Sequence, residues 1–233
     1  MLVPVLLLPK NGETGAVSAV VKIPMAIGFC LSALIALGAL FGWIRISAQQ
    51  QAANAEYEQQ RNDSQHQQHL DWIAQQKPTD PIVNILALTG RFHDADVRDS
   101  AVAKVKSHPD WEAELIQLLN ESDLHTEVYS FIDGNKVDHP ELFVEPINRS
   151  IRRCAQSIKN DITDSNNLQD WHFEHLSLDR LFRAIDEQFM LPGADYRPAV
   201  LELRAALDTP KPERFAKVRF TVEKVVDGWL KGK

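Results

Sequence analysis

Two histidines, His172 and His175, form the densest group of possible metal ligands in the sequence, within the segment WHFEH. Their spacing would place both imidazoles on one face of a helix, and imidazole nitrogen is a usual ligand of Zn²⁺. The order differs from the HExxH pattern, because the glutamate lies between the histidines. The carboxylates that would complete such a site are Asp170, Glu174 and Asp179. We keep both histidines as candidate metal ligands, expect ordinary helix surface there, and predict no metal and no cofactor.

A second cluster, His93, Asp94 and Asp96, also holds groups that can exchange protons. Acid–base catalysis would require a cleft and a partner that faces a substrate. An aspartate just before an apolar helical pattern commonly caps the helix instead. We therefore expect this turn to be the start of a helix.

The chain has two cysteines, Cys30 and Cys154. Cys30 lies in a long apolar run and Cys154 in the polar part, so we expect no disulfide between them. Cys154 follows Arg152-Arg153, whose charges would lower the thiol pKa if they lay against it, but a buried, unreactive cysteine is the simpler expectation. No CxxC, GxSxG, GxGxxG or Walker-type loop occurs, so the sequence predicts no enzyme.

Acidic residues dominate the chain beyond its first 46 positions. Of the 25 Lys and Arg and the 32 Asp and Glu, only Lys10, Glu13, Lys22 and Arg45 lie before that point, which leaves 22 cations against 31 acidic residues. A domain with this balance would repel a phosphate backbone unless it held a local basic patch. We therefore predict no nucleic-acid partner.

Residues 23–44 are predicted to cross a membrane. They read IPMAIGFCLSALIALGALFGWI without a charged side chain, and as a helix they would extend about 33 Å, against a hydrocarbon core of about 30 Å. Trp43 and Arg45 suit the headgroup layer. A buried core helix and a cleaved signal peptide are the alternatives, although a signal peptide normally has a shorter apolar region. We assign 23–46 to one transmembrane helix, which makes the lipid bilayer a partner.

Small residues in this segment would form a packing face. Gly38 and Gly42 make a GxxxG pair, and Gly28, Ser32 and Ala36 recur at four-residue spacing. Small residues one turn apart let helix backbones approach closely in lipid. This pattern indicates self-association or packing against another transmembrane helix.

Charges on either side of the apolar run favour a cytoplasmic N-terminus. Lys10 and Lys22 precede the run, and Arg45 and Arg61 follow it. Because cytoplasmic flanks hold more Lys and Arg, the α-amino group and the two lysines favour the polar part of the chain on the non-cytoplasmic side. The margin is one or two charges, and the cytoplasmic side stays the alternative.

Residues 47–70 form a glutamine-rich polar stem between the apolar run and the rest of the chain, and residues 1–22 form an N-terminal tail. The stem lacks an apolar stripe, which predicts a solvated helix or a flexible linker. His66 and His69 lie in it and are expected to be exposed.

Residues 71–233 are predicted to form a soluble all-α domain of helical hairpins. Apolar residues recur there at three- to four-residue spacing, and strand-like alternation is scarce. Proline and aspartate mark helix starts, and glycine and asparagine mark ends. The predicted helices cover about 80–89, 96–107, 110–120, 123–133, 140–162, 167–190, 196–208 and 211–230.

One stretch of this domain resembles the HEAT-type repeat. An acidic residue followed by inward-facing Val97, Ala101 and Val105 is typical of the second helix of such a repeat, and Ile82, Ile85, Leu86 and Leu88 would form the first helix. Leu115, Leu118, Val128 and Phe131 belong to a plausible second copy. The resemblance covers about 80–135 and implies a short α-solenoid whose stacked repeats form a binding surface.

These features together predict a single-pass, membrane-anchored helical scaffold. It would act by protein–protein interaction as an accessory subunit of a membrane complex, with other membrane or soluble subunits as partners. The alternative is a membrane-tethered enzyme or metal-binding protein that uses the His172/His175 region.

Overall fold

The computed structural model describes residues 43, 49–51, 53–121 and 124–232 of the chain, and the regular elements within these ranges are all helical. The chain divides into two compact units, Met1–Ser64 and Gln65–Lys233. The prediction of an all-α fold is confirmed.

Most of the predicted membrane segment lies outside the described residues. This holds for the tail at 1–22, for 23–46 apart from Trp43, and for the five packing residues Gly28, Ser32, Ala36, Gly38 and Gly42. Within the described part of the chain, no helix is both long and apolar enough to cross a membrane. Residues 53–64 are helical and all exposed, because this glutamine-rich sequence has no apolar face to bury.

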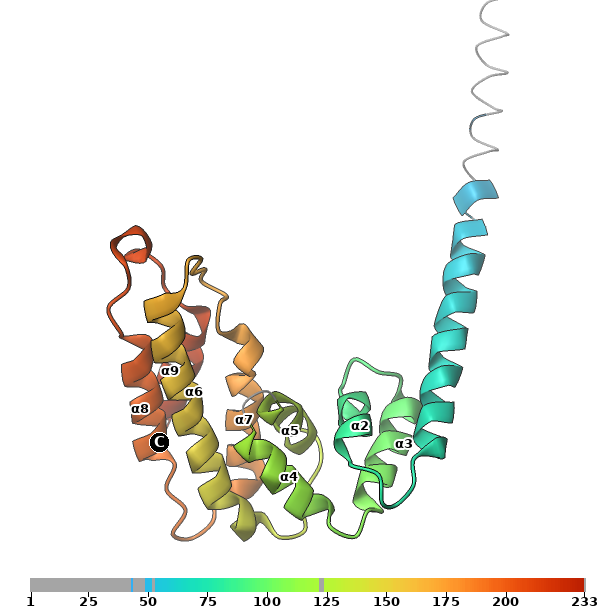
Figure 1. Ribbon diagram of the computed structural model, residues 1–233, viewed down its shortest axis with the longest axis horizontal. Helices are drawn as coiled ribbons and strands as arrows, with labels where there is room; N and C mark the ends of the chain where they lie inside the picture. The colour runs from blue at the N-terminus through green and yellow to red at the C-terminus, as the bar shows by residue number, and fades with distance from the viewer. Residues whose placement is uncertain (1–42, 44–48, 52, 122–123, 233) are drawn as a thin grey trace, which may run out of the picture. The chain divides into compact units, whose positions relative to one another are not determined.

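The second unit begins with helical residues 65–75 and continues as a chain of short helices (Figure 1). Beyond residue 75, five of the described helices exceed eight residues, and short 3-10 or π turns extend several others. In chain order the elements are α2 (Val83–Leu86), η1 (Ala87–Thr89), α3 (Ala95–Lys106), α4 (Trp111–Asn120), α5 (His125–Ile132), η2 (Pro140–Phe143), α6 (Val144–Asp164), η3 (Glu174–Leu176), α7 (Leu178–Ala184), η4 (Ile185–Phe189), α8 (Arg197–Leu207), η5 (Glu213–Phe215) and α9 (Thr221–Lys231).

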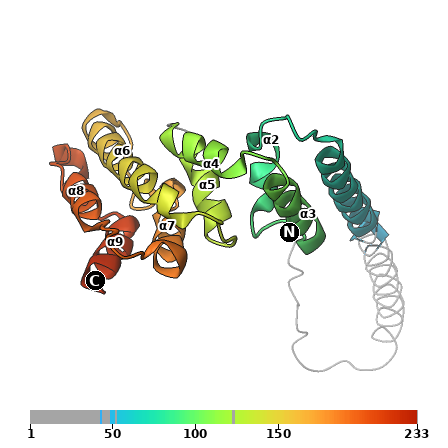
Figure 2. The same ribbon diagram turned by 90° about the horizontal axis from the view of Figure 1, so that it is seen from below.

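From α4 onward, alternate helices pack in two rows (Figure 2). The helices α4, α6 and α8 contact one another in that order, and α5, α7 and α9 do the same. The rows are joined where α4 contacts α5 and where α8 contacts α9. Before them, α2 packs on α3 and also reaches α5. Each helix therefore contacts mainly its neighbours along the stack.

A single hydrophobic cluster runs through the second unit from Ile73 to Trp229. Helix α6 shows how the sequence builds it: Ile147, Ile151, Ile158 and Ile162 are each fully buried. Their spacing of four and seven residues keeps them on one face of the helix, while polar residues occupy the other face. In the HEAT-like stretch, the three residues predicted to face inward, Val97, Ala101 and Val105, are buried as well.

The predicted helix at 167–190 is wrong in its first half. Residues 165–173 are irregular, η3 follows, and Ser177 has a left-handed φ of 51° ahead of α7. Leu168, Phe173 and Leu176 are all buried, and their spacing does not follow one helical stripe. The backbone carbonyl of Asp170 instead accepts a 2.8 Å hydrogen bond from Thr221 N at the start of α9, a tertiary contact that local sequence does not reveal.

The predicted helix at 211–230 is shorter in the structure, where α9 begins only at Thr221. Pro210 and Pro212 each disfavour helical backbone in the residue before them, so the chain makes the short turn η5 first. Phe220 stands just before α9 in extended backbone, and its ring is buried against the core. Phe220 is apolar and buried like the inner residues of α9, so the apolar pattern looks continuous in the sequence although Phe220 lies outside the helix.

Candidate functional site

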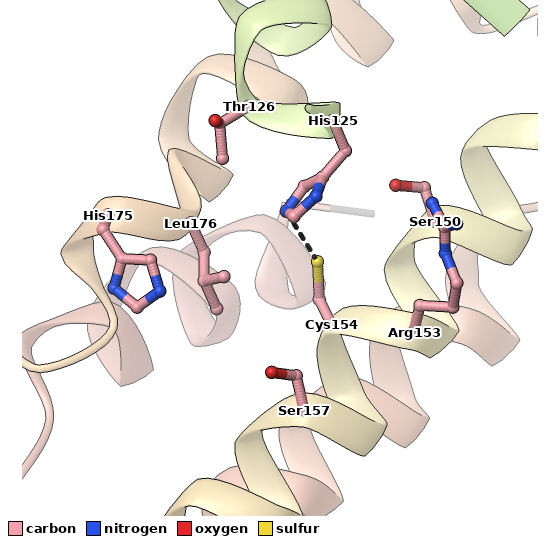
Figure 3. A pocket seen from close by; sticks show the side chains of 8 residues that line it. All are labelled: His125, Thr126, Ser150, Arg153, Cys154, Ser157, His175 and Leu176. Atoms are coloured by element: carbon pink, nitrogen blue, oxygen red, sulfur yellow. Dashed lines mark hydrogen bonds between the residues drawn. The ribbon is translucent and has the colours of Figure 1, made fainter. Parts of the chain in front are cut away.

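A pocket of about 380 Å³ lies between α5, α6 and η3 (Figure 3). Side chains from three separate stretches of the chain line it, so the tertiary fold creates the site. The lining residues are His125, Thr126, Ser150, Arg153, Cys154, Ser157, His175 and Leu176.

The pocket runs from a polar mouth to a closed floor. Ser157 and His175 are exposed at the mouth, whereas His125, Ser150, Cys154 and Leu176 are buried. On α6 the positions of Ser150, Arg153, Cys154 and Ser157 are three or four residues apart, which places them on one face of that helix. The first turn of α5 supplies His125 and Thr126 from the opposite wall.

Arg153 stands out among these side chains. Its Nε and Nη2 atoms are buried, and they have no hydrogen-bond partner among the residues that the structure describes. Its neighbour Arg152 differs, because Arg152 is half-exposed and its Nε lies 3.3 Å from Glu202 Oε1. A buried guanidinium nitrogen without an acceptor is costly, since desolvation is not offset by a new bond.

Cys154 and His125 form a buried pair on the floor. Cys154 Sγ lies 3.6 Å from His125 Nε2 and 4.0 Å from the Tyr129 hydroxyl, which also shares a 2.6 Å hydrogen bond with Ser150 Oγ. Burial raises the pKa of the Cys154 thiol to about 11, although the Tyr129 hydroxyl and the charge of Arg153 act in the opposite direction. The thiol is therefore protonated at neutral pH and is not an activated nucleophile.

The expectation that Cys154 is buried is confirmed, with 3% of the residue exposed. The two preceding arginines do not activate it, because Arg152 points to Glu202 and burial outweighs the influence of Arg153.

Of the candidate ligands, His172 lies in the turn before η3 and His175 lies in the 3-10 helix η3, so the two are not on one α-helix. His175 Nδ1 is 2.9 Å from the backbone carbonyl of His172, and the His172 ring meets Phe173 edge-on at 4.9 Å. The carboxylates near them have other partners: Glu174 accepts from the Thr221 hydroxyl at 2.7 Å, and Asp179 pairs with Arg183 at 3.1 Å. In the described ranges no group of three or more His, Cys, Asp or Glu side chains is placed to hold a metal ion.

The acidic turn at His93, Asp94 and Asp96 does begin a helix, since Asp94 stands at the N-cap of α3. Its carboxylate makes no cap hydrogen bond there. Instead, His66 Nδ1 lies 2.7 Å from Asp94 Oδ2, and its Nε2 lies 3.0 Å from Asp96 Oδ2. The hydrogen bond to Asp94 raises the pKa of His66, with the charges of both carboxylates adding to the effect.

Sequence reasoning missed most of the pocket. Among the lining residues, the sequence singles out only Cys154, Arg153 and His175 as candidate functional groups, and it does so for a different chemistry in each case. The pocket draws on residues as far apart as His125 and Leu176, and their convergence follows from the packing of α5 beside α6. The sequence does contain one local indication of the pocket. Helix α6 carries the side chains that line it at positions 150, 153, 154 and 157, three or four residues apart and so on one face of the helix.

Comparison of the chain with models of known families, with curated proteins and with solved structures yields no match.

Proposed function

We propose that this protein is a single-pass, membrane-anchored helical scaffold that acts through protein–protein contacts as an accessory subunit of a membrane complex. The observation that carries the proposal is the two-row packing in which α4, α6 and α8 contact in order beside α5, α7 and α9. Such packing supports the proposal, because a short α-solenoid would have it. In solenoids each helix pair contacts only its neighbours, so the stack presents an extended surface to partners.

The membrane anchor in this proposal rests on the sequence of 23–44. An uncharged apolar segment of this length, bounded by Lys22 and by Trp43 with Arg45, is typical of a transmembrane helix. Its Gly38/Gly42 pair supports packing against another membrane helix. The proposal places the helical stack on the non-cytoplasmic side, following the flanking charges.

The anchor is tested by alkaline carbonate extraction of membranes that contain the full chain. We expect the wild-type chain to stay in the membrane pellet. A variant with Leu34→Arg and Leu37→Arg should leave it, because each charge at the centre of a membrane helix costs about 2.5–3.5 kcal/mol. The matched control, Leu34→Phe with Leu37→Phe, should stay. Protease added to sealed vesicles then reports which side holds residues 65–233.

The scaffold role is tested by chemical crosslinking of the full chain in its native membranes. We expect a discrete adduct with a second protein, linked through residues 65–233. Leu203→Asp places a charge at a fully buried position of α8 and should abolish the adduct. Leu201→Asp makes the same change at a position that is 48% exposed and should keep it. A chain that runs alone, or an adduct that survives Leu203→Asp, would count against the stack as the interacting part.

A further inference from the structure

The pocket between α5, α6 and η3 carries a feature that the scaffold role does not use. Arg153 presents two buried nitrogen atoms without an acceptor in the described part of the chain, beside a cavity of about 380 Å³. Buried polar groups are nearly always paired, so an unpaired cationic donor at a cavity points to an anionic ligand. We propose that this pocket binds a phosphate group, either free or esterified to a small organic molecule.

The lining of the pocket is suited to an anion. The hydroxyl groups of Thr126 and Ser157 line the same pocket as Arg153, and both can donate hydrogen bonds. None of the described residues that line the pocket is an aspartate or a glutamate. In a chain with a formal net charge of −7, this is a local cationic pocket in an acidic surrounding.

No described residue that lines the pocket cancels the charge of Arg153. Burial raises the pKa of both Cys154 and Tyr129, so the thiol and the phenol stay neutral at pH 7. A bound anion would therefore face an uncompensated guanidinium, whose planar fork of N–H groups matches two oxygens of a phosphate.

The first turn of α5 adds to the attraction. Thr126 lines the pocket from this turn, and helix N-termini favour negative charge. The Thr126 hydroxyl from α5 and the Arg153 guanidinium from α6 thus line the same pocket from two helices, which suits an oxyanion with acceptors on several sides.

The size and the opening of the pocket set the class of ligand. Its volume lies near the lower end of the range for small-molecule sites, about 300–1,000 Å³, and leaves room for more than a single phosphate ion. Ser157 and His175 are exposed at its mouth, so an organic group attached to the phosphate has a path to solvent.

The test is binding of inorganic phosphate to the purified full chain, measured by the rise in thermal unfolding temperature and by broadening of the phosphate ³¹P signal at constant ionic strength. We expect both effects in the wild type. Arg153→Gln should weaken phosphate binding by about tenfold or more, because it removes the only arginine of the pocket while keeping most of its volume. Arg152→Gln, the adjacent arginine on the exposed side, should bind as the wild type does.

Without phosphate, Arg153→Gln should unfold at the same temperature as the wild type or higher, since it relieves a buried unpaired charge. A purely structural arginine would give the opposite result. Ser157→Glu is a variant at an exposed position and does not disturb the core. It puts a carboxylate at the mouth of the pocket and should weaken phosphate binding by repulsion. The control Gln156→Glu adds the same charge at the exposed neighbouring position and should not weaken binding.

Three outcomes would overturn the assignment: no effect of phosphate on the wild type, equal binding by Arg153→Gln, or equal protection by acetate. Glycerol 3-phosphate separates the two sources of the group. Tighter binding than inorganic phosphate identifies an esterified ligand such as a lipid headgroup, and weaker binding identifies the free ion. None of these results depends on the scaffold role, which the crosslinking experiment tests separately.

Discussion

Asp133 is the most deeply buried carboxylate for which an ion pair is described. Only 2% of the residue is exposed, and its two oxygens accept hydrogen bonds of 2.9 and 3.0 Å from Arg183 Nε and Nη2. Arg91 Nη2 lies 3.3 Å from Asp133 Oδ2. The pair joins the end of α5 to α7, and it holds together two helices of the same row.

Asp133→Asn should therefore destabilise the protein by about 2–3 kcal/mol, because a buried two-point ion pair loses its anion. This loss of stability is at the lower end of what breaking a buried ion pair costs, because the Arg183 side chain is 45% exposed. The matched control is Asp179→Asn, which removes the exposed partner of the same arginine and should cost less than about 1 kcal/mol. Urea unfolding of the full chain measures both, and equal costs would show that burial of Asp133 adds nothing.

Glu112 and His139 form a second pair whose strength depends on pH. His139 Nδ1 lies 2.6 Å from Glu112 Oε2, and the backbone N–H groups of Asp138 and His139 donate to Oε1 at 2.6 and 2.9 Å. The hydrogen bond to Glu112 raises the pKa of His139 from 6.5. Burial acts to raise the pKa of Glu112, but the hydrogen bonds from His139 and Asp138 outweigh it and lower that pKa from 4.5.

The signs of these shifts define a pH window. The raised pKa of His139 stabilises the fold fully below about pH 6.5, and this contribution is lost as the pH rises through the folded-state pKa. The lowered pKa of Glu112 stabilises the fold above about pH 4.5, and this contribution is lost as the pH falls through its folded-state pKa. The free-energy difference between the wild type and His139→Gln should therefore be largest between those two values. Urea unfolding at a series of pH values measures it, and a difference that is flat with pH would contradict the linkage.

At the scale of the elements, α3 shows how one helix face decides packing. Val97, Ala101 and Val105 are buried on the inner face, whereas Ala103 is exposed on the outer face. The small side chain of Ala101 lets α3 lie close to its neighbours α2 and η1. Ala101 is fully enclosed, with 0% of the residue exposed, so a larger side chain there would press on its neighbours.

Ala101→Leu should therefore destabilise the protein by about 1–3 kcal/mol through overpacking. Ala103→Leu adds the same atoms to the same helix on its exposed side and should change the free energy of unfolding by less than about 0.5 kcal/mol. Thermal or urea unfolding distinguishes them. If the two variants behaved alike, the predicted inner face of α3 would not be the packed face.

At the scale of the whole molecule, stability is expected to be uneven along the chain. Side chains of residues 53–64 are all exposed, so burial does not stabilise this stretch of helix, while α6 carries a continuous buried stripe. An isolated helix of this length is marginal in water. Helices that share a core open only with the global unfolding of the domain.

Hydrogen exchange of the full chain should show this contrast. We expect amides in 53–64 to exchange with opening free energies near zero, and amides at the centre of α6 to approach the global stability of a domain, about 5–15 kcal/mol. Mass spectrometry after timed exchange measures both segments in one sample, so α6 is the internal control. Strong protection of 53–64 would mean that a partner or a second copy of the chain covers that helix.

The helical nature of the fold followed from the sequence alone. Apolar spacing places helices at α3, α4, α5, α6 and α8 to within a few residues, and it identifies the buried face of α3, because a regular 3.6-residue period is a local property. The same reasoning failed at 167–177 and 211–220. There the apolar residues are buried by irregular backbone, which tertiary hydrogen bonds such as Thr221 N to Asp170 O stabilise.

The candidate site was decided by the tertiary structure. The spacing of His172 and His175 in the sequence made both of them candidate ligands. Only His175 lines the pocket, together with Arg153 from α6 and His125 from α5. The pairing of Asp133 with Arg183 likewise spans 50 positions. A local pattern records which face of an element is buried, whereas the partner across that face depends on how the helices stack. The unpaired state of Arg153 is a property of that stacking, and no reading of its neighbours in the chain could have shown it.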